Sequence, residues 1–397
     1  MTLRMFAGAV CVAALSTSAV AAPSDEERAR ARTIYQTIVE MDTSVEGGRV
    51  PEMATYLAGQ FRDAGFESGD VTVVPFDKTA ALVVRFRGTG SAQKPILFIA
   101  HMDVVPAHRA DWERDPFKLI EEKGYFFGRG SEDNKSGLAT VAATFMTLKR
   151  EGFKPSRDLV IVFSGDEETS GMTTQRLLSE HKELVDAEFA INTDAGGGQL
   201  SEKGAAIYYG LQTAEKTFAS FTLTAKNPGG HSSAPKRENA IFDVADAVER
   251  LRRYAFPVMW NDTTIAAFRE TGPITEGKMG LAMTRFARRP GDRRAAAVIA
   301  ADPYHVGQVR TTCIPTMLAG GHADNALPQR ASVTVNCRIF PGVKIEQVQA
   351  QLQRLVGKKI EIAPLDKYTA SDASPLRKDV IAAVTAAVHA SHPGVKI

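Results

Sequence analysis

Acidic residues and one histidine follow the apolar segments in the first half of this sequence, each near the point where a segment ends. A carboxylate at the end of a buried strand costs folding free energy unless it finds a partner. A shared metal ion is one such partner, and one imidazole with several carboxylates suits Zn²⁺, with Mn²⁺ or Co²⁺ as alternatives. The residues concerned are His101, Asp103, Asp133, Asp166, Glu167, Glu168 and Asp194.

These side chains share an ion only if the chain brings the ends of their segments together. The sequence alternates expected strands and helices, with strands at 71–76, 81–87, 95–100, 158–164 and 188–194 and helices at 136–151 and 174–180. Near-continuous apolar strands between helices are typical of a mostly parallel, doubly wound α/β sheet with both faces covered. The carboxyl ends of such strands meet at one edge, where ligands bind. We therefore predict a metal site at that edge, because carboxylates so close together need a cation.

The pattern changes after residue 211. The expected order is a strand at 218–225, a helix at 239–252, a long irregular insertion, a hairpin of 311–318 and 331–340, a helix at 343–356 and a strand at 358–364. Apart from the insertion, this β-α-β-β-α-β order is the ferredoxin-like arrangement. We expect residues 212–363 to form an α+β domain inserted into a catalytic domain of residues 22–211 and 364–397. The return segment would contribute a helix at 376–390.

The N-terminus has the features of a secretory signal peptide. Arg4 precedes an apolar stretch over residues 5–15, and Ala19-Val20-Ala21 forms a small-x-small cleavage signal. We expect residues 1–21 to be removed before Ala22, because the stretch is too short to span a bilayer. The protein is then exported, periplasmic or secreted, and not membrane-bound after cleavage. The formal net charge of +2 gives no indication of a nucleic-acid partner.

Two cysteines remain after removal of the leader, which contains Cys11. Cys313 and Cys337 flank the expected hairpin and could face each other across two strands. An oxidising compartment permits a disulfide bond between them. Since the geometry of a cross-strand disulfide is demanding, the sequence favours two buried free thiols.

The motifs around these residues resemble, in the same order, those of the co-catalytic zinc exopeptidases. The motifs are HMDVVPAHRADWERDPF, GRGSEDNKSG, FSGDEETSG, NTDAGG, NPGGHSSAP and DNALPQ with NCRIFPG. This family includes glutamate carboxypeptidase, aminoacylase, succinyl-diaminopimelate desuccinylase and carboxypeptidase S. The resemblance implies a zinc-exopeptidase α/β domain with a ferredoxin-like lid, through which two chains form a homodimer. It also implies a carboxypeptidase or dipeptidase that cleaves small peptides or N-acyl amino acids.

The resemblance assigns the metal ligands residue by residue. Asp133 would bridge two Zn²⁺ ions per chain, His101 and Asp194 would complete one site, and Glu168 would bind the other ion. Asp103 would orient the imidazole of His101 from behind. The peptide bond after the bridging Asp133 would be cis, as in other members of the family.

The catalytic and substrate-binding roles come from the same resemblance. Glu167 would be the general base. It would take a proton from a metal-bridging water, which becomes the attacking hydroxide, and deliver that proton to the departing amine. His231 would reach across the dimer to stabilise the oxyanion of the tetrahedral intermediate. Arg338 and Asn325 would hold the terminal carboxylate of the substrate.

One ligand of the family pattern is not found in the sequence. The family completes its second metal site with a histidine near the C-terminus, whereas this sequence ends at SHPGVKI, at the start of an expected strand. We expect either a fragment of a longer chain or a degenerate member with one competent metal site. The alternative function is therefore a non-catalytic, metal-stabilised protein that binds peptides or amino acids.

Overall fold

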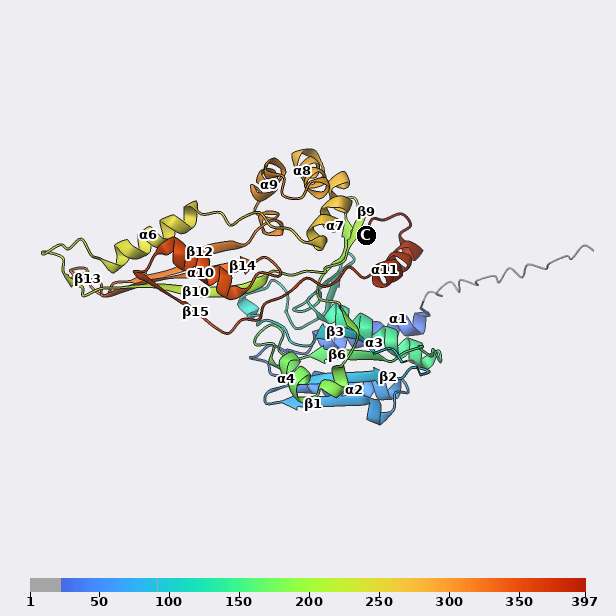
Figure 1. The fold of residues 1–397 in the computed structure, drawn as a ribbon. Helices are drawn as coiled ribbons and strands as arrows, with labels where there is room; N and C mark the ends of the chain where they lie inside the picture. Colours follow the sequence, from blue (N-terminus) through green and yellow to red (C-terminus); the bar gives the residue numbers. More distant parts are fainter. Residues whose placement is uncertain (1–22, 91) are drawn as a thin grey trace, which may run out of the picture. The chain divides into compact units, whose positions relative to one another are not determined.

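The computed structural model describes residues 23–90 and 92–397. They form two compact units, one ending at Ala195 and one comprising Gly196–Ile397 (Figure 1). The predicted leader, residues 1–21, lies outside the described residues. No helix in the described part of the chain is both long and apolar enough to span a membrane.

A five-stranded sheet forms the centre of the first unit. Its order is β1-β2-β6-β3-β7, and the strands are β1 (Val71–Phe76), β2 (Thr79–Phe86), β3 (Ile96–His101), β6 (Leu159–Ser164) and β7 (Phe189–Asn192). β3 pairs in parallel with both β6 and β7, whereas β1 and β2 are antiparallel neighbours at the other side of the sheet. The α/β fold class is confirmed, and the parallel pairing is found among the strands that carry site residues.

Helices cover both faces of this sheet. α1 (Asp25–Val39), α2 (Val50–Asp63) and α3 (Lys135–Arg150) share one core with the sheet, whose members include Leu57, Phe61, Leu138, Phe145 and Phe163. α4 (Met172–Glu180) and α5 (Lys182–Val185) pack on the other face, where Leu177 and Val185 meet Val160 and Val162. The shorter elements are η1 (Ser68–Asp70), η2 (Arg109–Asp111), β4 (Ile120–Glu122) and β5 (Tyr125–Phe127).

Two glycines allow the close packing that places the site residues. A Cβ atom at Gly165, directly after β6, would lie 2.3 Å from the carbonyl oxygen of Ala80. A Cβ atom at Gly137, in the first turn of α3, would lie 2.4 Å from Oγ1 of Thr193. Real Cβ atoms do not approach other atoms so closely, so these contacts require glycine.

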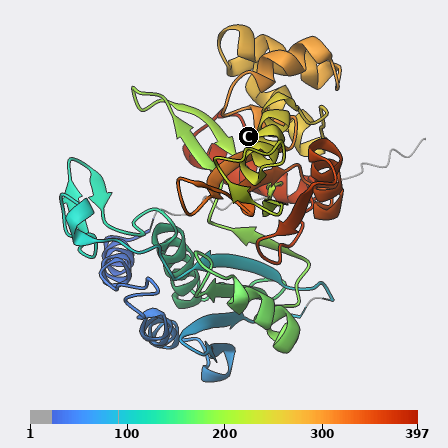
Figure 2. The same cartoon turned by 90° about the vertical axis from the view of Figure 1, so that its left-hand side faces the viewer.

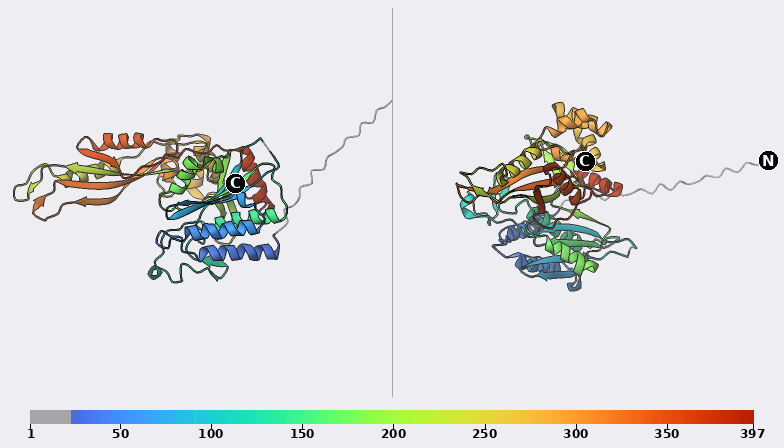
Figure 3. Two further views of the ribbon diagram at one scale, coloured as in Figure 1. Left: turned by 90° about the horizontal axis from the view of Figure 1, so that it is seen from below. Right: turned by 60° about the vertical axis from the view of Figure 1, so that its left-hand side comes forward.

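The second unit contains the predicted ferredoxin-like arrangement. The strands β10 (Thr217–Lys226), β12 (Thr312–Gly320), β14 (Arg330–Ile339) and β15 (Ile360–Pro364) form an antiparallel sheet in the order β12-β14-β10-β15. Figure 3 shows the long strands of this sheet. The helices α6 (Ala240–Arg253) and α10 (Ile345–Val356) pack on it around Phe221, Val335 and Leu352. The element order is β-α-β-β-α-β, as predicted.

The insertion expected to be irregular is helical, so that prediction was wrong. It contains α7 (Asp262–Thr271), η3 (Gly272–Ile274), α8 (Gly277–Arg288), α9 (Arg293–Ala300) and η4 (Val306–Gln308), with α8 and α9 orange in Figure 2. Phe268, Met283, Phe286 and Ile299 form a separate core there. Asn261 and Asp292 cap α7 and α9 through their side chains.

The remaining elements of the second unit are short or peripheral. They are β8 (Gly197–Leu200), β9 (Ala206–Gly210), β11 (Gly230–His231), β13 (Ala326–Leu327) and α11 (Lys378–Ser391). α11 contains no buried residue, and Lys396 after it forms a parallel bridge with Tyr208.

Cys313 and Cys337 form a disulfide bond, which contradicts the expectation of two free thiols. The two residues are directly opposite each other in the β12–β14 register, and their Cα atoms are 4.0 Å apart. Pairing across neighbouring antiparallel strands brings the Cβ atoms within reach of a bond. The register of the hairpin, which the sequence alone does not define, decides the pairing.

Candidate metal centre and active site

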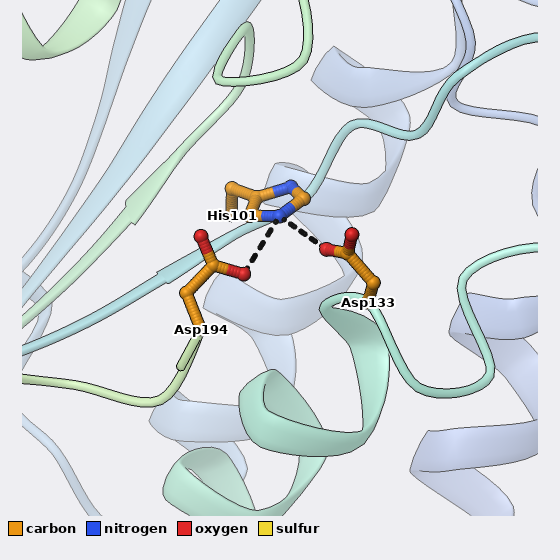
Figure 4. Close-up of side chains that lie close together, drawn as sticks. All are labelled: His101, Asp133 and Asp194. Carbon is orange, nitrogen blue, oxygen red and sulfur yellow. Dashed lines mark hydrogen bonds and ion pairs between the residues drawn. The ribbon is translucent and has the colours of Figure 1, made fainter. Parts of the chain in front are cut away.

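Three of the four predicted metal ligands lie together in the first unit. Nε2 of His101 is 2.9 Å from Oδ1 of Asp133 and 3.4 Å from Oδ1 of Asp194 (Figure 4). The three ligand atoms lie within 4.8 Å of one another. Among the described residues, Glu168 is outside this group. The arrangement gives one imidazole nitrogen and two carboxylates facing the same small space.

The fold explains why these three side chains meet. His101 ends β3, Asp194 lies two residues after the end of the parallel neighbour β7, and Asp133 lies two residues before the start of α3. The carboxyl ends of parallel strands open onto one edge of a sheet. The peptide bond Asp133–Asn134 is cis, as the resemblance implied.

Asn134 organises this edge, although no sequence motif predicted a role for its side chain. The side chain is buried, and its Nδ2 donates to Oδ1 of Asp194 at 2.8 Å. Its Oδ1 accepts from Oγ1 of Thr193 at 3.1 Å. The side-chain amide of Asn134 therefore holds the carboxylate of Asp194 in place, and Asn134 itself directly follows Asp133, the second carboxylate of the group. A signal was present only in its position directly after the bridging Asp133.

His101 is held in an orientation that suits a metal ligand. The ring is 2% exposed, and its Nδ1 lies 3.0 Å from the backbone oxygen of Asp103. Since a carbonyl oxygen can only accept, Nδ1 carries the proton and Nε2 faces the two carboxylates. Burial lowers the pKa of His101, but the bonds and charges of Asp103 and Asp194 outweigh it and raise that pKa to about 11.

Asp103 also fixes the turn that carries the two glutamates. Its buried carboxylate accepts from the backbone N–H of Glu167 at 3.0 Å and from that of Glu168 at 2.9 Å. One oxygen is 3.4 Å from Nδ1 of His101. The same carboxylate thus contacts both the histidine and the predicted base and ligand, which joins these three residues into one structure.

Both glutamates have raised pKa values. Burial raises the pKa of Glu167, and the nearby carboxylates add to this effect against the opposing charge of His101. Burial likewise raises the pKa of Glu168, with Asp133 the largest contributor among the neighbouring charges. The two glutamates therefore interact electrostatically with charged residues of the three-ligand group.

The donor set fits a transition-metal dication. A zinc-ligating histidine is a neutral imidazole with a hydrogen bond at one ring nitrogen, so an ion bound at Nε2 of His101 would replace the proton that the raised pKa keeps there. Carboxylates that converge on that nitrogen repel one another unless a cation lies between them. His101, Asp133 and Asp194 could hold one ion, and the negative charges of Asp133 and Glu168 repel each other.

The predicted oxyanion and carboxylate-binding residues lie in the second unit. His231 of β11 pairs with Ala326 of β13, and the carbonyl oxygen of Asn325 accepts from the N–H of Ser232 at 2.9 Å. The structure therefore brings His231 and Asn325 side by side. Arg338 is exposed on β14, with its guanidinium 4.9 Å from the centre of the Phe218 ring.

Lys216, which lies outside every motif noted in the sequence, is a second cation near Arg338. Burial lowers the pKa of Lys216, and the charge of Arg338 lowers it further. Lys216 directly precedes β10, whose Phe218 is opposite Arg338 in the sheet register. Only the pairing of β10 with β14 places the two cations in the same neighbourhood, so sequence spacing gave no indication of it.

Comparison with known proteins tests the resemblance seen in the motifs. Residues 97–395 match the peptidase family M20/M25/M40. The chain belongs to this family. Membership confirms the resemblance to the co-catalytic exopeptidases, several of whose motifs surround the residues grouped in Figure 4.

Relatives of this M20 chain include hydrolases of two kinds. N-fatty-acyl-amino acid synthase/hydrolase PM20D1 of Mus musculus is 26% identical over 298 residues, which cover 73% of this chain and 58% of that protein. Probable carboxypeptidase S-like 2 of Dictyostelium discoideum is 27% identical over 330 residues, covering 76% and 60%. The M20 chain thus spans about three-fifths of the length of these relatives.

Solved structures share the fold of the M20 chain. The M20 family metallo-carboxypeptidase Sso-CP2 from Sulfolobus solfataricus superposes with a TM-score of 0.64 at 19% identity, covering 94% of this chain and 86% of that one. The YXEP protein of Bacillus subtilis, described as a dinuclear metal-binding peptidase of the M20 family, gives a TM-score of 0.54 at 12% identity, covering 94% and 82%.

Proposed function

We propose that this M20 chain is a metal-dependent hydrolase that cleaves the amide bond of dipeptides or N-acyl amino acids, as a carboxypeptidase or dipeptidase does. The observation that carries the proposal is the convergence of His101, Asp133 and Asp194 beside a turn that presents Glu167 and Glu168. The names of the relatives, which include fatty-acyl-amino acid hydrolases and carboxypeptidases, support the same reaction class.

Two zinc ions are the proposed cofactors, with Co²⁺ or Mn²⁺ as substitutes. His101, Asp133 and Asp194 would hold one ion, and Asp133 with Glu168 the other. When bound, zinc lowers the pKa of water and polarises the scissile carbonyl. Asp103 keeps the imidazole of His101 in the tautomer that leaves Nε2 free to bind.

Glu167 is the proposed general base. It takes a proton from the attacking water and delivers it to the nitrogen of the departing amine, so that the proton balance of hydrolysis closes. The bond from its backbone N–H to Asp103 fixes the start of the side chain. Burial and neighbouring acids raise the pKa of Glu167, which favours a carboxyl that accepts and returns a proton.

Residues of the second unit are the proposed substrate contacts. His231 would stabilise the oxyanion that forms on the scissile carbonyl. Arg338 and Asn325 would hold the terminal carboxylate, because a guanidinium binds a carboxylate through two parallel hydrogen bonds. The proximity of His231 to Asn325 in the β11–β13 pair supports a shared role.

Replacing Glu167 with Gln tests the proposed reaction. The change keeps the size of the side chain but removes its ability to accept a proton. We expect an unaltered zinc content, measured by elemental analysis, and a loss of several orders of magnitude in kcat for dipeptides and N-acyl amino acids. Glu151→Gln, at the end of α3, is the matched control.

Two results would contradict the proposal. Unchanged turnover in the Glu167→Gln protein would exclude the assigned base. Zinc binding by the wild-type protein without hydrolysis of any amide would instead favour the non-catalytic binding protein considered from the sequence.

We also propose that the protein is exported. The predicted leader of residues 1–21 supports export, and the disulfide bond between Cys313 and Cys337 is typical of an oxidising compartment. The intact mass of the protein from its native host measures both features, because a mature chain starting at Ala22 and a closed disulfide each change the mass. A mass that includes Met1 would contradict export with cleavage.

A homodimer through the second unit is the proposed assembly. β12 is an edge strand of the four-stranded sheet, and its residues 316–320 are all exposed. Met317 and Leu318 are large apolar side chains among them, and α6 adds the exposed Ile241 and Phe242 nearby. An exposed apolar edge strand tends to pair with another chain, and a second copy gives a closed twofold contact.

A further inference from the structure

The helical insertion of the second unit carries a group of arginines that the proposed hydrolysis does not use. α8 ends and α9 begins in the segment RRPGDRR, residues 288–294. Its four arginines, called the turn arginines below, are all exposed: Arg288, Arg289, Arg293 and Arg294. Residues 277–300 contain six basic residues and one acidic residue, although the formal net charge of the whole chain is only +2. The turn is therefore a local concentration of positive charge.

The acidic residue of this segment is already engaged within the protein. Asp292 is buried, and its carboxylate accepts from the backbone N–H groups of Arg294 at 3.1 Å and Ala295 at 3.0 Å. It also accepts from Nε of Arg285 at 2.9 Å. In the described part of the chain, no salt bridge joins a turn arginine to an acidic residue. Asp292 and Arg285 thus hold the turn, and the guanidinium groups of the turn arginines face solvent.

The positions of the turn arginines are unfavourable for the helix that follows them. Arg293 and Arg294 occupy the first turn of α9, where the helix dipole places partial positive charge. Four like charges within seven residues also repel one another. Because no acidic partner among the described residues offsets these costs, an anionic surface that approached the turn would relieve both.

Exposed apolar side chains lie among the basic ones on both helices. Leu281 of α8 is 75% exposed, and spacings of four and seven residues place it on the same face as Arg285 and Arg288. On α9, the exposed Val298 lies one turn after Arg294. Arginine side chains can contact lipid headgroups while a leucine between them enters the apolar boundary of a bilayer. The surface therefore combines the two properties that binding to an anionic membrane requires.

Trp260 lies beside the turn and is 45% exposed. A Cβ atom at Gly291, within the turn, would lie 2.9 Å from Cη2 of the indole. The indole also contacts Phe286, with the two ring centroids 6.1 Å apart. Tryptophan is enriched at the boundary between lipid headgroups and acyl chains. Its place beside Gly291 also makes its fluorescence a reporter of the surroundings of the turn.

We propose that the α8–α9 hairpin is a peripheral membrane-binding site for anionic phospholipids. The turn arginines contact the lipid phosphates, and Leu281 and Trp260 enter the interface. A basic side chain near an anionic membrane strengthens binding by about fivefold, so the four arginines together contribute about 600-fold. The proposal goes beyond amide hydrolysis and does not depend on it.

The exposed apolar side chains favour a lipid over a nucleic acid as the partner. A nucleic acid would neutralise the arginines through its phosphates but would leave Leu281 uncovered. The proposal revises the expectation of a mature chain without a membrane partner, because peripheral contact needs no membrane-spanning helix.

Sedimentation with lipid vesicles tests the proposal. The protein starting at Ala22 is used, because an uncleaved leader would bind lipid by itself. Vesicles of phosphatidylcholine alone are compared with vesicles that contain about 30 mol% of the anionic phosphatidylglycerol. We expect binding to the anionic vesicles only, and its loss in about 0.5 M NaCl, where the charges are screened. In a Trp112→Phe background, the same vesicles should shift the emission of Trp260 to shorter wavelength.

Two pairs of neighbouring arginines give a matched comparison. Arg293→Gln/Arg294→Gln removes two turn arginines and should weaken binding to the anionic vesicles by about 25-fold. Because this change also removes unfavourable charge from the N-terminus of α9, the loss of binding does not reflect a weakened helix. Arg252→Gln/Arg253→Gln on α6 changes the net charge equally, but these two arginines pair with Glu249. This control should leave vesicle binding unchanged.

A change at Leu281 separates lipid binding from binding to a nucleic acid. Leu281→Gln should weaken vesicle binding by about tenfold, because an apolar side chain no longer enters the interface. Leu365→Gln is the control, since Leu365 is 54% exposed and lies outside the insertion. Binding of a labelled DNA duplex, measured by fluorescence anisotropy, should not depend on Leu281.

Each of three results would overturn the proposal. The first is the absence of vesicle binding, or equal binding to neutral and anionic vesicles. The second is binding of the DNA duplex that requires the turn arginines, without binding to vesicles, which would assign the surface to a nucleic acid. The third is a changed oligomeric state of the Arg293→Gln/Arg294→Gln protein in light scattering, without vesicle binding by the wild-type protein, which would assign the hairpin to a contact between copies of this chain.

Discussion

Removal of the disulfide bond should destabilise the second unit by an amount that its position in the chain defines. The bond joins Cys313 to Cys337 across a sequence separation of 24 residues. In the chain-entropy description, closing a loop of this length in the unfolded state stabilises the folded one by about 3.4 kcal/mol at 25 °C. With a urea m-value of about 2 kcal/mol/M, the Cys313→Ala/Cys337→Ala variant should unfold at a midpoint lower by about 1.5–2 M.

Tryptophan fluorescence can report this change unit by unit. The chain contains two tryptophans, Trp112 in the first unit and Trp260 in the second. In a Trp112→Phe background the signal comes from Trp260, whose ring contacts Phe286 in the core of the insertion. Wild-type protein held in a reductant is the control, because it loses the bond and keeps both sulfur atoms. A midpoint shift below about 0.5 M would refute the reasoning.

Two further predictions concern an ion pair and the proposed dimer. Burial raises the pKa of Asp158, but bonds from the Gly88 N–H and the Arg85 guanidinium outweigh it and leave that pKa below its ordinary value. Asp158→Asn should therefore lower the free energy of unfolding by about 1–2 kcal/mol at pH 7. Urea titrations of the variant and the wild-type protein should show that this difference in stability disappears as the pH falls below about 4, where the carboxylate becomes protonated. A stability difference that is independent of pH would exclude the assignment. Leu318→Lys, on the exposed part of β12, should convert the dimer to a monomer in light scattering, whereas Leu365→Lys after the opposite edge strand should not; a dimer that survives Leu318→Lys would exclude this edge.

The apolar runs of the sequence predicted the first unit well, for a simple physical reason. A run such as residues 158–164 is apolar because both faces of its strand are buried, and that burial can be read from composition alone. Because the carboxyl ends of parallel strands lie at one edge of the sheet, the residues that follow these runs must lie near one another. For this reason the position of His101 and Asp194 at one edge of the sheet was predictable.

Features that depend on pairing between distant segments were not predictable in this way. The contact of Cys313 with Cys337 requires the register of β12 and β14, which shifts at an irregularity between Pro315 and Met317. The bond from Asn134 to Asp194 depends on how α3 approaches β7. Neither leaves a pattern within its own segment of the sequence.

The prediction for the insertion was wrong for a different reason, because its helices do have local sequence signals. Asn261 and Asp292 are good N-cap residues, and both accept backbone N–H bonds in the structure. Met283 and Phe286 have helical spacing and are buried. The expectation of irregular structure gave too little weight to these caps and to the helical spacing.

The glutamate turn distinguishes two ways of burying a carboxylate. Asp103 and Asp166 are almost completely buried, and backbone N–H groups of the same turn or of the following helix donate to both. Burial raises the pKa values of Glu167 and Glu168 instead, and neighbouring carboxylates add to the increase. Hydrogen bonds from the backbone thus stabilise the carboxylates of Asp103 and Asp166, which build the turn. The carboxylates of Glu167 and Glu168, which the turn presents, remain in an unfavourable electrostatic environment. A bound dication would relieve that cost for Glu168 as a ligand, while Glu167 would keep an affinity for the proton that hydrolysis requires it to transfer.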